Sequence, residues 1–224
     1  MLKPDAWLSG ILGKPVYHLS SPAEEFARPK GPAFLDAKVP VDEFATLICL
    51  QAQGFVVIDT NIQMARPAGE LVQERARVRY ANPGDALEVK RLAAGAFVYD
   101  RFHRDPALGH TAASRVKSEW AGNYFLGKRG DRMIVAEDSA GVCGFLQLLR
   151  GEDGATVIDL MAVDARSRRK GAAKSMIALA ANAPGTGSMR VGTQIANTAS
   201  LVLYAALGFR IVSASYVLHL HIAD

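Results

Sequence analysis

Cysteine is scarce in this chain of 224 residues, which has only Cys49 and Cys143. Two isolated cysteines in apolar surroundings make neither a disulfide framework nor a metal-ligand pattern, so the sequence predicts no metal site. We interpret both as reduced residues of the hydrophobic core. Reduced thiols are typical of proteins of the cytoplasm, which is the location that the sequence favours.

Long hydrophobic runs and blocks of one charge are also missing. No apolar run approaches the roughly 20 residues of a membrane-spanning helix, and residues 1–5 lack the layout of a signal peptide. The net charge is +4 and the sequence pI about 9.1, but no long Lys/Arg block is present. Membranes and nucleic acids are therefore not expected as partners, and local binding of an anion explains the mild basicity equally well.

What is present is the composition of a globular α/β protein, with half of the residues hydrophobic. Residues 1–73 are predicted to form a small N-terminal α/β domain and its connector, which begins near Met64. Its expected elements are strands at 16–19, 33–37 and 55–60 and a helix at 41–53. That helix has Phe44, Leu47, Ile48 and Ala52 at helical spacing, which predicts that they face the core.

Residues 74–224 are predicted to form the larger domain. Asp85 and Glu88 have the spacing of a capping box at the start of its first helix. The expected elements are strands at 78–81, 133–136, 142–148, 157–163, 189–193, 211–212 and 216–220, and helices at 85–96, 111–124, 175–180 and 197–207. Their order, β-α-α-β-β-β-α-β-α-β-β, predicts a mixed sheet flanked by helices.

The most informative stretch is residues 163–174, between a strand and a helix. Five cations crowd this end of the helix, where the helix dipole disfavours positive charge. An anion bound at the free amides would resolve the conflict, and Gly171, Ala172 and Ala173 would let it approach closely. The alternative is a solvated charged turn.

Two motifs resemble the GNAT acetyltransferase family. The first is Arg168-Arg169-Lys170-Gly171-Ala172-Ala173, after Val163. The second runs from Asn197 through Tyr204 to Leu207-Gly208-Phe209. The resemblance covers about residues 76–224 and implies the GNAT fold, a mixed and mostly antiparallel central sheet flanked by helices. It also implies acetyl-CoA as donor and a small-molecule primary amine as acceptor, both held in one ternary complex.

A closer likeness is to the TDP-fucosamine acetyltransferase branch, whose members N-acetylate an amino sugar carried on TDP. Three parts of the chain are similar to that branch: residues 191–199, residues 93–97 with Arg101 and Phe102, and the N-terminal unit with Trp7, residues 50–55 and Asp59. The likeness implies an amino sugar or amino-sugar nucleotide as acceptor, and an acceptor-side role for residues 1–73.

The resemblance also assigns roles to residues. Tyr204 is the expected general acid for the leaving thiolate, although on spacing alone it reads as a core aromatic. Asn197 is expected to bond the pantetheine, or to cap its helix, or both. An amide near Met161 would stabilise the oxyanion. The residues expected to bind acetyl-CoA are Leu160, Met161, Ala162, Val163, Arg168, Arg169, Lys170, Gly171, Ala172, Ala173, Lys174, Asn197 and Tyr204.

The acceptor side is less constrained by the sequence. Asp59 is the expected general base, since the branch has an acidic residue there; a strand-end turn is the alternative. Arg101 and Phe102 lie in the loop where GNAT enzymes often receive the acceptor, and Arg101 would suit a phosphate. His219 and His221 share one face of a late strand and would line the acceptor pocket or face solvent.

Two other functions fit the same residues. One is a GNAT enzyme that acts on another amine, such as an amino acid, a polyamine or a protein N-terminus. The other is a non-catalytic regulator that binds acyl-CoA. The sequence leaves the oligomeric state open, with a homodimer as one arrangement.

Overall fold

A computed structural model describes residues 1–20, 26–72 and 76–223. Among these residues, ten strands form one sheet in the order β1-β2-β3-β10-β4-β9-β8-β7-β6-β5. The strands are β1 (Leu2–Pro4), β2 (Val16–Leu19), β3 (Ala33–Pro40), β4 (Val56–Arg66), β5 (Arg77–Tyr80), β6 (Arg132–Asp138), β7 (Gly141–Arg150), β8 (Thr156–Val163), β9 (Met189–Gln194) and β10 (Arg210–Ile222). The helices are α1 (Ala6–Leu12), α2 (Phe44–Ala52), α3 (Ala86–Ala96), α4 (His110–Gly122), α5 (Ala172–Ala181) and α6 (Thr198–Ala206), with short 3-10 helices at Pro83–Asp85 and Ala165–Ser167.

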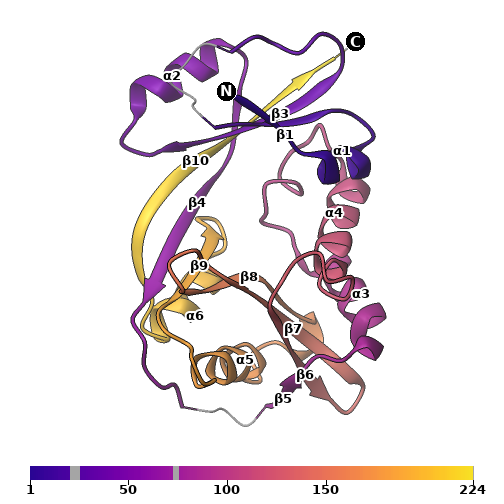
Figure 1. Ribbon diagram of the computed structural model, residues 1–224, viewed down its shortest axis with the longest axis vertical. Helices are drawn as coiled ribbons and strands as arrows, with labels where there is room; N and C mark the ends of the chain where they lie inside the picture. The colour runs from indigo at the N-terminus through magenta and orange to yellow at the C-terminus, as the bar shows by residue number, and fades with distance from the viewer. Residues whose placement is uncertain (21–25, 73–75, 224) are drawn as a thin grey trace.

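The sheet is mixed and mostly antiparallel, as predicted. Only the β2–β3 and β8–β9 pairs of the described strands are parallel. Two long strands, β4 and β10, run side by side from the part of the molecule that holds α2 to the part that holds α5 and α6 (Figure 1). Because β4 lies between β10 and β9, the strands of the first 66 residues belong to the same sheet as the rest. The expected domain boundary falls at residues 73–75, outside the described residues, and the two-domain division stays a prediction.

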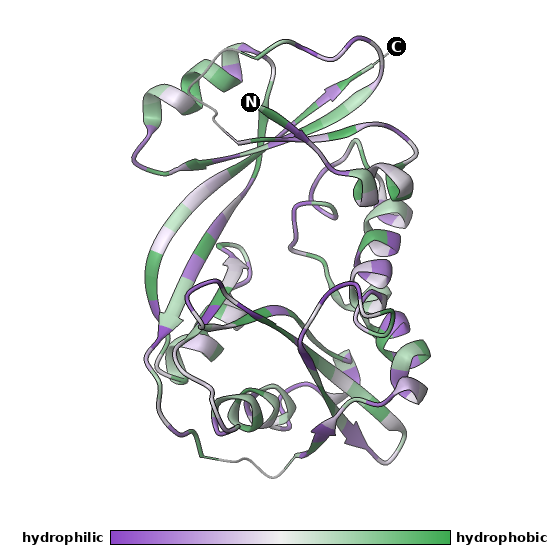
Figure 2. Ribbon diagram, in the orientation of Figure 1, coloured by the Kyte–Doolittle hydropathy of each residue, from purple (hydrophilic) through white to green (hydrophobic). Residues whose placement is uncertain are grey.

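In the part of the sheet from β5 to β9, alternating residues of the strands contribute to two hydrophobic clusters, one on each face. On one face, Ile134 and Leu146 pack with Met176 and Ile177 of α5. The other face is covered by α3 and α4, whose buried side chains pack against the neighbouring strand positions. Figure 2 shows mainly hydrophobic residues along the middle of β7, where residues 143–148 are all buried. Burial on both faces explains why this strand has a largely apolar sequence.

The long strand β10 replaces two predicted strands at 211–212 and 216–220. A register shift between Ile211 and Ser213 lets one strand bend and continue beside β4. β4 likewise extends to Arg66, through the start of the predicted connector. The predicted capping box at Asp85 and Glu88 was misplaced, because Asn82 and Asp85 form it one turn earlier.

The first two elements, β1 and α1, were not predicted, although their signals are in the sequence. The Asp5 side chain accepts a hydrogen bond from the Leu8 amide and caps α1. Gly13 ends the helix in the left-handed conformation, with φ of 69°. The seven-residue helix is too short for its periodicity to stand out.

Helix α2 forms where the sequence predicts a helix, but it turns a different side to the sheet. Leu47 and Leu50 are buried, whereas Phe44 and Ile48 are 61% and 53% exposed. Cys49 lies on the exposed side, so its prediction as a core residue was wrong, while Cys143 is buried as predicted. None of the described helices is both long and apolar enough to cross a bilayer.

Candidate functional site

The basic stretch forms the turn from β8 into α5. Asp164 accepts a hydrogen bond from the Arg166 amide and forms an ion pair with its guanidinium. Arg168 donates from Nε to the Val163 carbonyl at 3.1 Å. Arg169 adopts φ of 62°, which is uncommon outside glycine, and Gly171 follows with φ of 85°. This backbone delivers the chain to the N-terminus of α5 with its basic side chains exposed.

A cavity of about 810 Å³ lies against this turn and is called here the β8–β9 cavity. It exists because β8 and β9 separate: they pair at Thr156, Val157 and Ile158, and the recorded pairing ends there. The end of α3 and the loop after it close the other side. The lining residues are Ala96, Phe97, Val98, Tyr99, Asp100, Met161, Ala162, Val163, Ser167, Arg168, Arg169, Lys170, Gly171, Ala172, Ala173, Lys174, Gln194, Asn197, Ala199, Ser200 and Leu203.

Most of the residues expected to bind acetyl-CoA therefore line one cavity. Asn197 is among them, and its side chain also accepts a hydrogen bond from the Ser200 amide at 3.3 Å, so it caps α6. Leu160 and Tyr204 are the exceptions, since neither is among the lining residues. Leu160 is buried in the core, and only its backbone could contribute.

Tyr204 lies in the hydrophobic core beside the cavity. It is 4% exposed, and its ring packs against Phe209 with centroids 5.4 Å apart. Burial raises the pKa of the Tyr204 phenol well above its usual range. The phenol is therefore neutral at physiological pH and has a proton to give.

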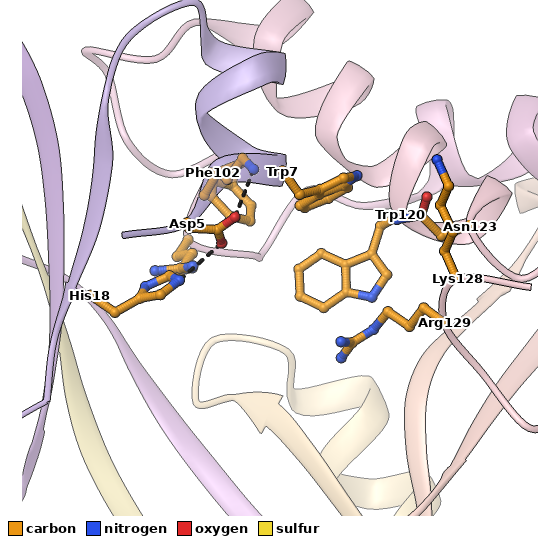
Figure 3. A pocket seen from close by; sticks show the side chains of 10 residues that line it. Asp5, Trp7, His18, Phe102, Trp120, Asn123, Lys128 and Arg129 are labelled. Carbon is orange, nitrogen blue, oxygen red and sulfur yellow. Dashed lines mark hydrogen bonds and ion pairs between the residues drawn. The ribbon is translucent and has the colours of Figure 1, made fainter. Parts of the chain in front are cut away.

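A second cavity, of about 490 Å³, lies between the N-terminal elements and α4 and is called here the tryptophan cavity. Its lining residues are Asp5, Trp7, Leu8, His18, Arg101, Phe102, Trp120, Asn123, Lys128 and Arg129. Figure 3 shows Trp7 and Trp120 facing the same space, with Arg129 beside Trp120. The rings of Trp7 and Trp120 meet edge to face with centroids 5.9 Å apart. The cavity thus combines aromatic faces with several cations.

A hydrogen-bonded chain fixes one wall of the tryptophan cavity. His18 bonds Asp5 at 2.9 Å through Nε2 and Asp36 at 2.8 Å through Nδ1, and Arg101 pairs with Asp36 at 2.6 Å. Burial alone would raise the pKa of Asp36, but Arg101 and His18 together lower it to about 2. The hydrogen bond to Asp36 raises the pKa of His18. Arg101 and Phe102, both predicted to contact the acceptor, line this cavity and stack at 4.5 Å.

Asp159 supports the opposite wall. Its carboxylate accepts hydrogen bonds from Trp120 Nε1 at 2.9 Å and from Arg129 Nε and Nη2 at 2.8 and 2.6 Å. The register of β7 and β8 shifts at this point, where Gln147 pairs with Leu160 and Leu148 with Ile158. Asp159 is the extra residue of that bulge, and bulges commonly redirect a side chain next to a functional site.

His219 occupies neither cavity. It is 1% exposed, and its Nδ1 lies 2.6 Å from Asp105 Oδ2, while His221 Nε2 lies 2.8 Å from the same oxygen. Burial lowers the pKa of His219. These three residues are a group whose ligand atoms could surround a metal ion, within 4.8 Å of one another. The two short hydrogen bonds to one oxygen already account for the arrangement, and they tie the loop after α3 to β10.

Asp59 is 7% exposed and lines neither cavity. Burial raises its pKa to about 6, against the lowering effects of the Thr60 amide and of Arg104. The charge of Asp100, which does line the β8–β9 cavity, adds to the rise. Asp59 is therefore a buried carboxyl with a pKa of about 6 that lies outside the walls of both cavities.

Sequence reasoning missed several residues of the tryptophan cavity. They are Asp5, His18, Asn123, Lys128 and Arg129. Each is an isolated polar residue in a short or irregular segment, and they come together only through the fold. In the sequence, aromatic and polar residues are frequent near Trp7 and Trp120, but they form no local motif that would have identified a site.

Comparison with known proteins places this geometry in a family. A model of the GNAT acetyltransferase domain matches residues 129–211, which include the β8–α5 turn, the separating ends of β8 and β9, and Tyr204. The chain carries a GNAT acetyltransferase domain. The family predicted from the motifs at Arg168–Ala173 and Asn197–Phe209 is thereby confirmed.

Two curated relatives and two solved structures agree. The chain is 28% identical to the spore coat polysaccharide biosynthesis protein SpsD of Bacillus subtilis, over 84% of this chain and 66% of SpsD. It is also 28% identical to a dTDP-fucosamine acetyltransferase of Escherichia coli, over 83% of this chain and 80% of that protein. The chain thus spans about two thirds of the length of SpsD.

The solved structures support the fold. A conserved protein of unknown function from Staphylococcus epidermidis has a TM-score of 0.62 at 16% identity, over 83% of this chain and 71% of that one. A GNAT-family acetyltransferase from Colwellia psychrerythraea has a TM-score of 0.53 at 14% identity, over 85% and 65%. These similarities confirm the predicted GNAT fold.

Proposed function

We propose that the protein is an N-acetyltransferase that moves an acetyl group from acetyl-CoA to the primary amine of an amino sugar or amino-sugar nucleotide. The observation that carries the proposal is the β8–β9 cavity, which lies inside the matched GNAT domain and is lined by Met161, Asn197 and the basic turn. The sugar acceptor is supported by the names of the two relatives and by the tryptophan cavity.

The donor would bind along the edge that β8 exposes after Ile158. The amides around Gly171 and the start of α5 would hold the CoA pyrophosphate, because a helix N-terminus attracts anions. Arg168 and Lys174 would add charge-assisted contacts. The amide near Met161 would face the thioester carbonyl and stabilise the oxyanion, a contact typically worth about 3 kcal/mol.

Acetyl transfer then proceeds by direct attack. The substrate ammonium loses one proton to Asp59, and the neutral nitrogen attacks the thioester carbon to form the C–N bond. The C–S bond breaks, and Tyr204 protonates the departing sulfur. The second proton of the nitrogen returns to the Tyr204 phenolate, and the first proton is left on Asp59. The products are the acetamide and CoA, and one proton per turnover is left over. Binding both reactants in one complex supplies the alignment.

The acceptor would occupy the tryptophan cavity with its amine directed at the β8–β9 cavity. Sugars and nucleobases pack well on aromatic faces such as Trp7 and Trp120. Arg101 and Arg129 are already paired with buried carboxylates, which leaves Lys128 as the exposed cation best suited to a phosphate. A bulky phosphorylated acceptor suits the size of the tryptophan cavity better than a small amino acid does. A polyamine carries positive charge and would bind better between acidic walls.

The test is thiol release from acetyl-CoA with amino sugars, free and nucleotide-linked, beside simple amines. Turnover on a nucleotide-linked 4-amino sugar with none on polyamines or amino acids is the expected result. Turnover confined to simple amines would overturn the acceptor, and absence of turnover over the whole panel would favour a regulator that binds acyl-CoA. Exposed Cys49 reacts with thiol reagents as well, so a Cys49→Ala protein serves as the background control. A cytoplasmic location and a homodimer stay predictions of the sequence.

A further inference from the structure

A chain of hydrogen-bonding side chains runs from the β8–β9 cavity to the protein surface. Asp100 lines the cavity and is 4% exposed, and its Oδ2 lies 2.5 Å from Nδ1 of His103. The His103 side chain is 2% exposed, and its Nε2 lies 3.3 Å from Ser114 Oγ. Ser114 Oγ in turn lies 3.3 Å from Nδ1 of His110, which is exposed at the start of α4.

We propose that Asp100, His103, Ser114 and His110 form a path that carries the proton released by acetyl transfer from the cavity to solvent. The inference rests on the proposed function, because acetylation of an ammonium substrate leaves one proton in the cavity at each turnover. Asp59, the proposed first acceptor of that proton, is too buried to return it to water directly. Asp100 itself lines the β8–β9 cavity, so the path begins in the cavity where the reaction takes place, and the proposal includes transfer of the proton from Asp59 to Asp100.

Each member of the path has the chemistry that relay requires. A carboxylate accepts a proton, and imidazole accepts at one nitrogen while it donates from the other. A hydroxyl donates one hydrogen bond and accepts others, so Ser114 can take a proton from His103 and give its own to His110. One proton thus enters at Asp100, one leaves His110 for water, and each intermediate group ends with the number of protons it had.

The surroundings keep the inner end of the path in place and dry. Oδ1 of Asp100 accepts a hydrogen bond from the Phe102 amide at 3.1 Å, and Lys117 Nζ lies 3.6 Å from the same oxygen. Lys117 is buried and lies over the rings of Phe97, Phe102 and Trp120. His103 and His110 pack edge to face with ring centroids 5.0 Å apart, which keeps the two imidazoles beside Ser114. Asp100, held in this way, is oriented toward His103 rather than toward bulk solvent.

The experiment uses Ser114→Ala, which removes one hydroxyl from a half-buried position on α4. In weakly buffered solution, kcat on the best amine should fall about 10- to 100-fold, as expected when one proton transfer becomes difficult. Added imidazole should restore the rate in proportion to its concentration, since a small base can replace the missing link. Ser118→Ala, the same change one helical turn later, should keep the unaltered rate and show no imidazole effect. His110→Gln should behave like Ser114→Ala to a smaller extent.

The outcomes separate this inference from the proposed function. An unaltered protein that acetylates no amine defeats the proposed function and the path with it. Turnover by the unaltered protein, with Ser114→Ala and His110→Gln as fast as it at every buffer concentration, defeats the path alone. A slow Ser114→Ala protein that imidazole does not restore shows a structural role for Ser114 and also overturns the path.

Discussion

Arg129 and Asp159 form a two-pronged ion pair, with Nε and Nη2 of the arginine 2.8 and 2.6 Å from the two carboxylate oxygens. The pair holds the guanidinium 4.8 Å over the ring of Trp120. Asp159 is the bulge residue of β8, just beyond the last β8–β9 pair at Ile158. One irregularity in β8 therefore shapes both cavities: the strand leaves β9 on one side and supports the tryptophan cavity on the other.

Because Asp159 already neutralises Arg129, we expect Lys128 to carry most of the free positive charge on that side of the tryptophan cavity. Lys128→Ala should raise KM for a phosphorylated acceptor about 10-fold, the effect of one charge-assisted hydrogen bond, and should leave kcat and the Kd for CoA unchanged. Steady-state kinetics with a nucleotide-linked amino sugar and with the free sugar give the comparison. Lys30→Ala, an exposed lysine outside both cavities, is the control. An equal rise in KM for both sugars would contradict a phosphate contact.

Tyr204→Phe removes only the phenol oxygen and keeps the packing against Phe209. We expect kcat to fall 10²-fold or more, since a general acid typically contributes about 10²–10⁴-fold. The Kd for CoA, measured by calorimetry, should change less than about threefold. Phe209→Leu, which disturbs the same contact without touching the phenol, separates packing from chemistry. A Tyr204→Phe protein with unaltered kcat would leave Tyr204 as a core aromatic.

The raised pKa of Asp59 has consequences for rate and for stability. A base with a pKa of about 6 is active in its deprotonated form, so kcat/KM should rise as pH increases through 6. Asp59→Asn should lose most of the rate, and its kcat/KM should no longer rise with pH in this range. In the unfolded chain the same carboxyl has a pKa near 3.8. The folded state therefore binds the extra proton between pH 3.8 and 6, and stability falls as pH rises through that window.

Asp59→Asn should change stability and activity in opposite directions. Asp59→Asn should raise the free energy of unfolding at pH 8 by about 1–3 kcal/mol, because a buried charge is removed, and should have little effect at pH 3.5. Urea unfolding at the two pH values measures the difference. Asp42→Asn provides an exposed control. Equal stabilities of the two proteins at pH 8 would show that Asp59 is not held in the buried state.

The donor side of the site could be predicted from sequence because it is contiguous. The turn at residues 163–174 and the helix start at Asn197 each contain their own strand, glycine and cap signals, so local pattern and function coincide. The acceptor side could not be predicted in the same way. Its walls come from α1, β2, the loop after α3 and the end of α4, and only tertiary packing brings Trp7 within 5.9 Å of Trp120.

The errors have related causes. In α2, two buried leucines at i and i+3 decide which side meets the sheet, and the apolar Phe44 and Ile48 are exposed although they fit the periodicity equally well. In β10, the sequence Ser213-Ala214-Ser215 reads as a break between strands, yet pairing with β4 on one side carries the strand through. Both errors arise because contacts with neighbouring elements decide the outcome, and the periodicity of a single segment does not describe those contacts.

Gly171 is the position in the donor turn where backbone conformation can be tested most directly. Its φ of 85° lies in the left-handed region, at the residue that precedes the first turn of α5. Gly171→Ala should cost about 1–2 kcal/mol of folding free energy. It should also weaken CoA binding about 10-fold, because relief of the strain turns the amides of the first helical turn away from the pyrophosphate. Gly10→Ala is the matched control, since Gly10 lies inside α1 with open space around its Cβ position, and the change should stabilise the protein by up to about 1 kcal/mol. Unaltered CoA affinity in Gly171→Ala, together with the expected loss of stability, would show that the amides at this turn do not hold the donor.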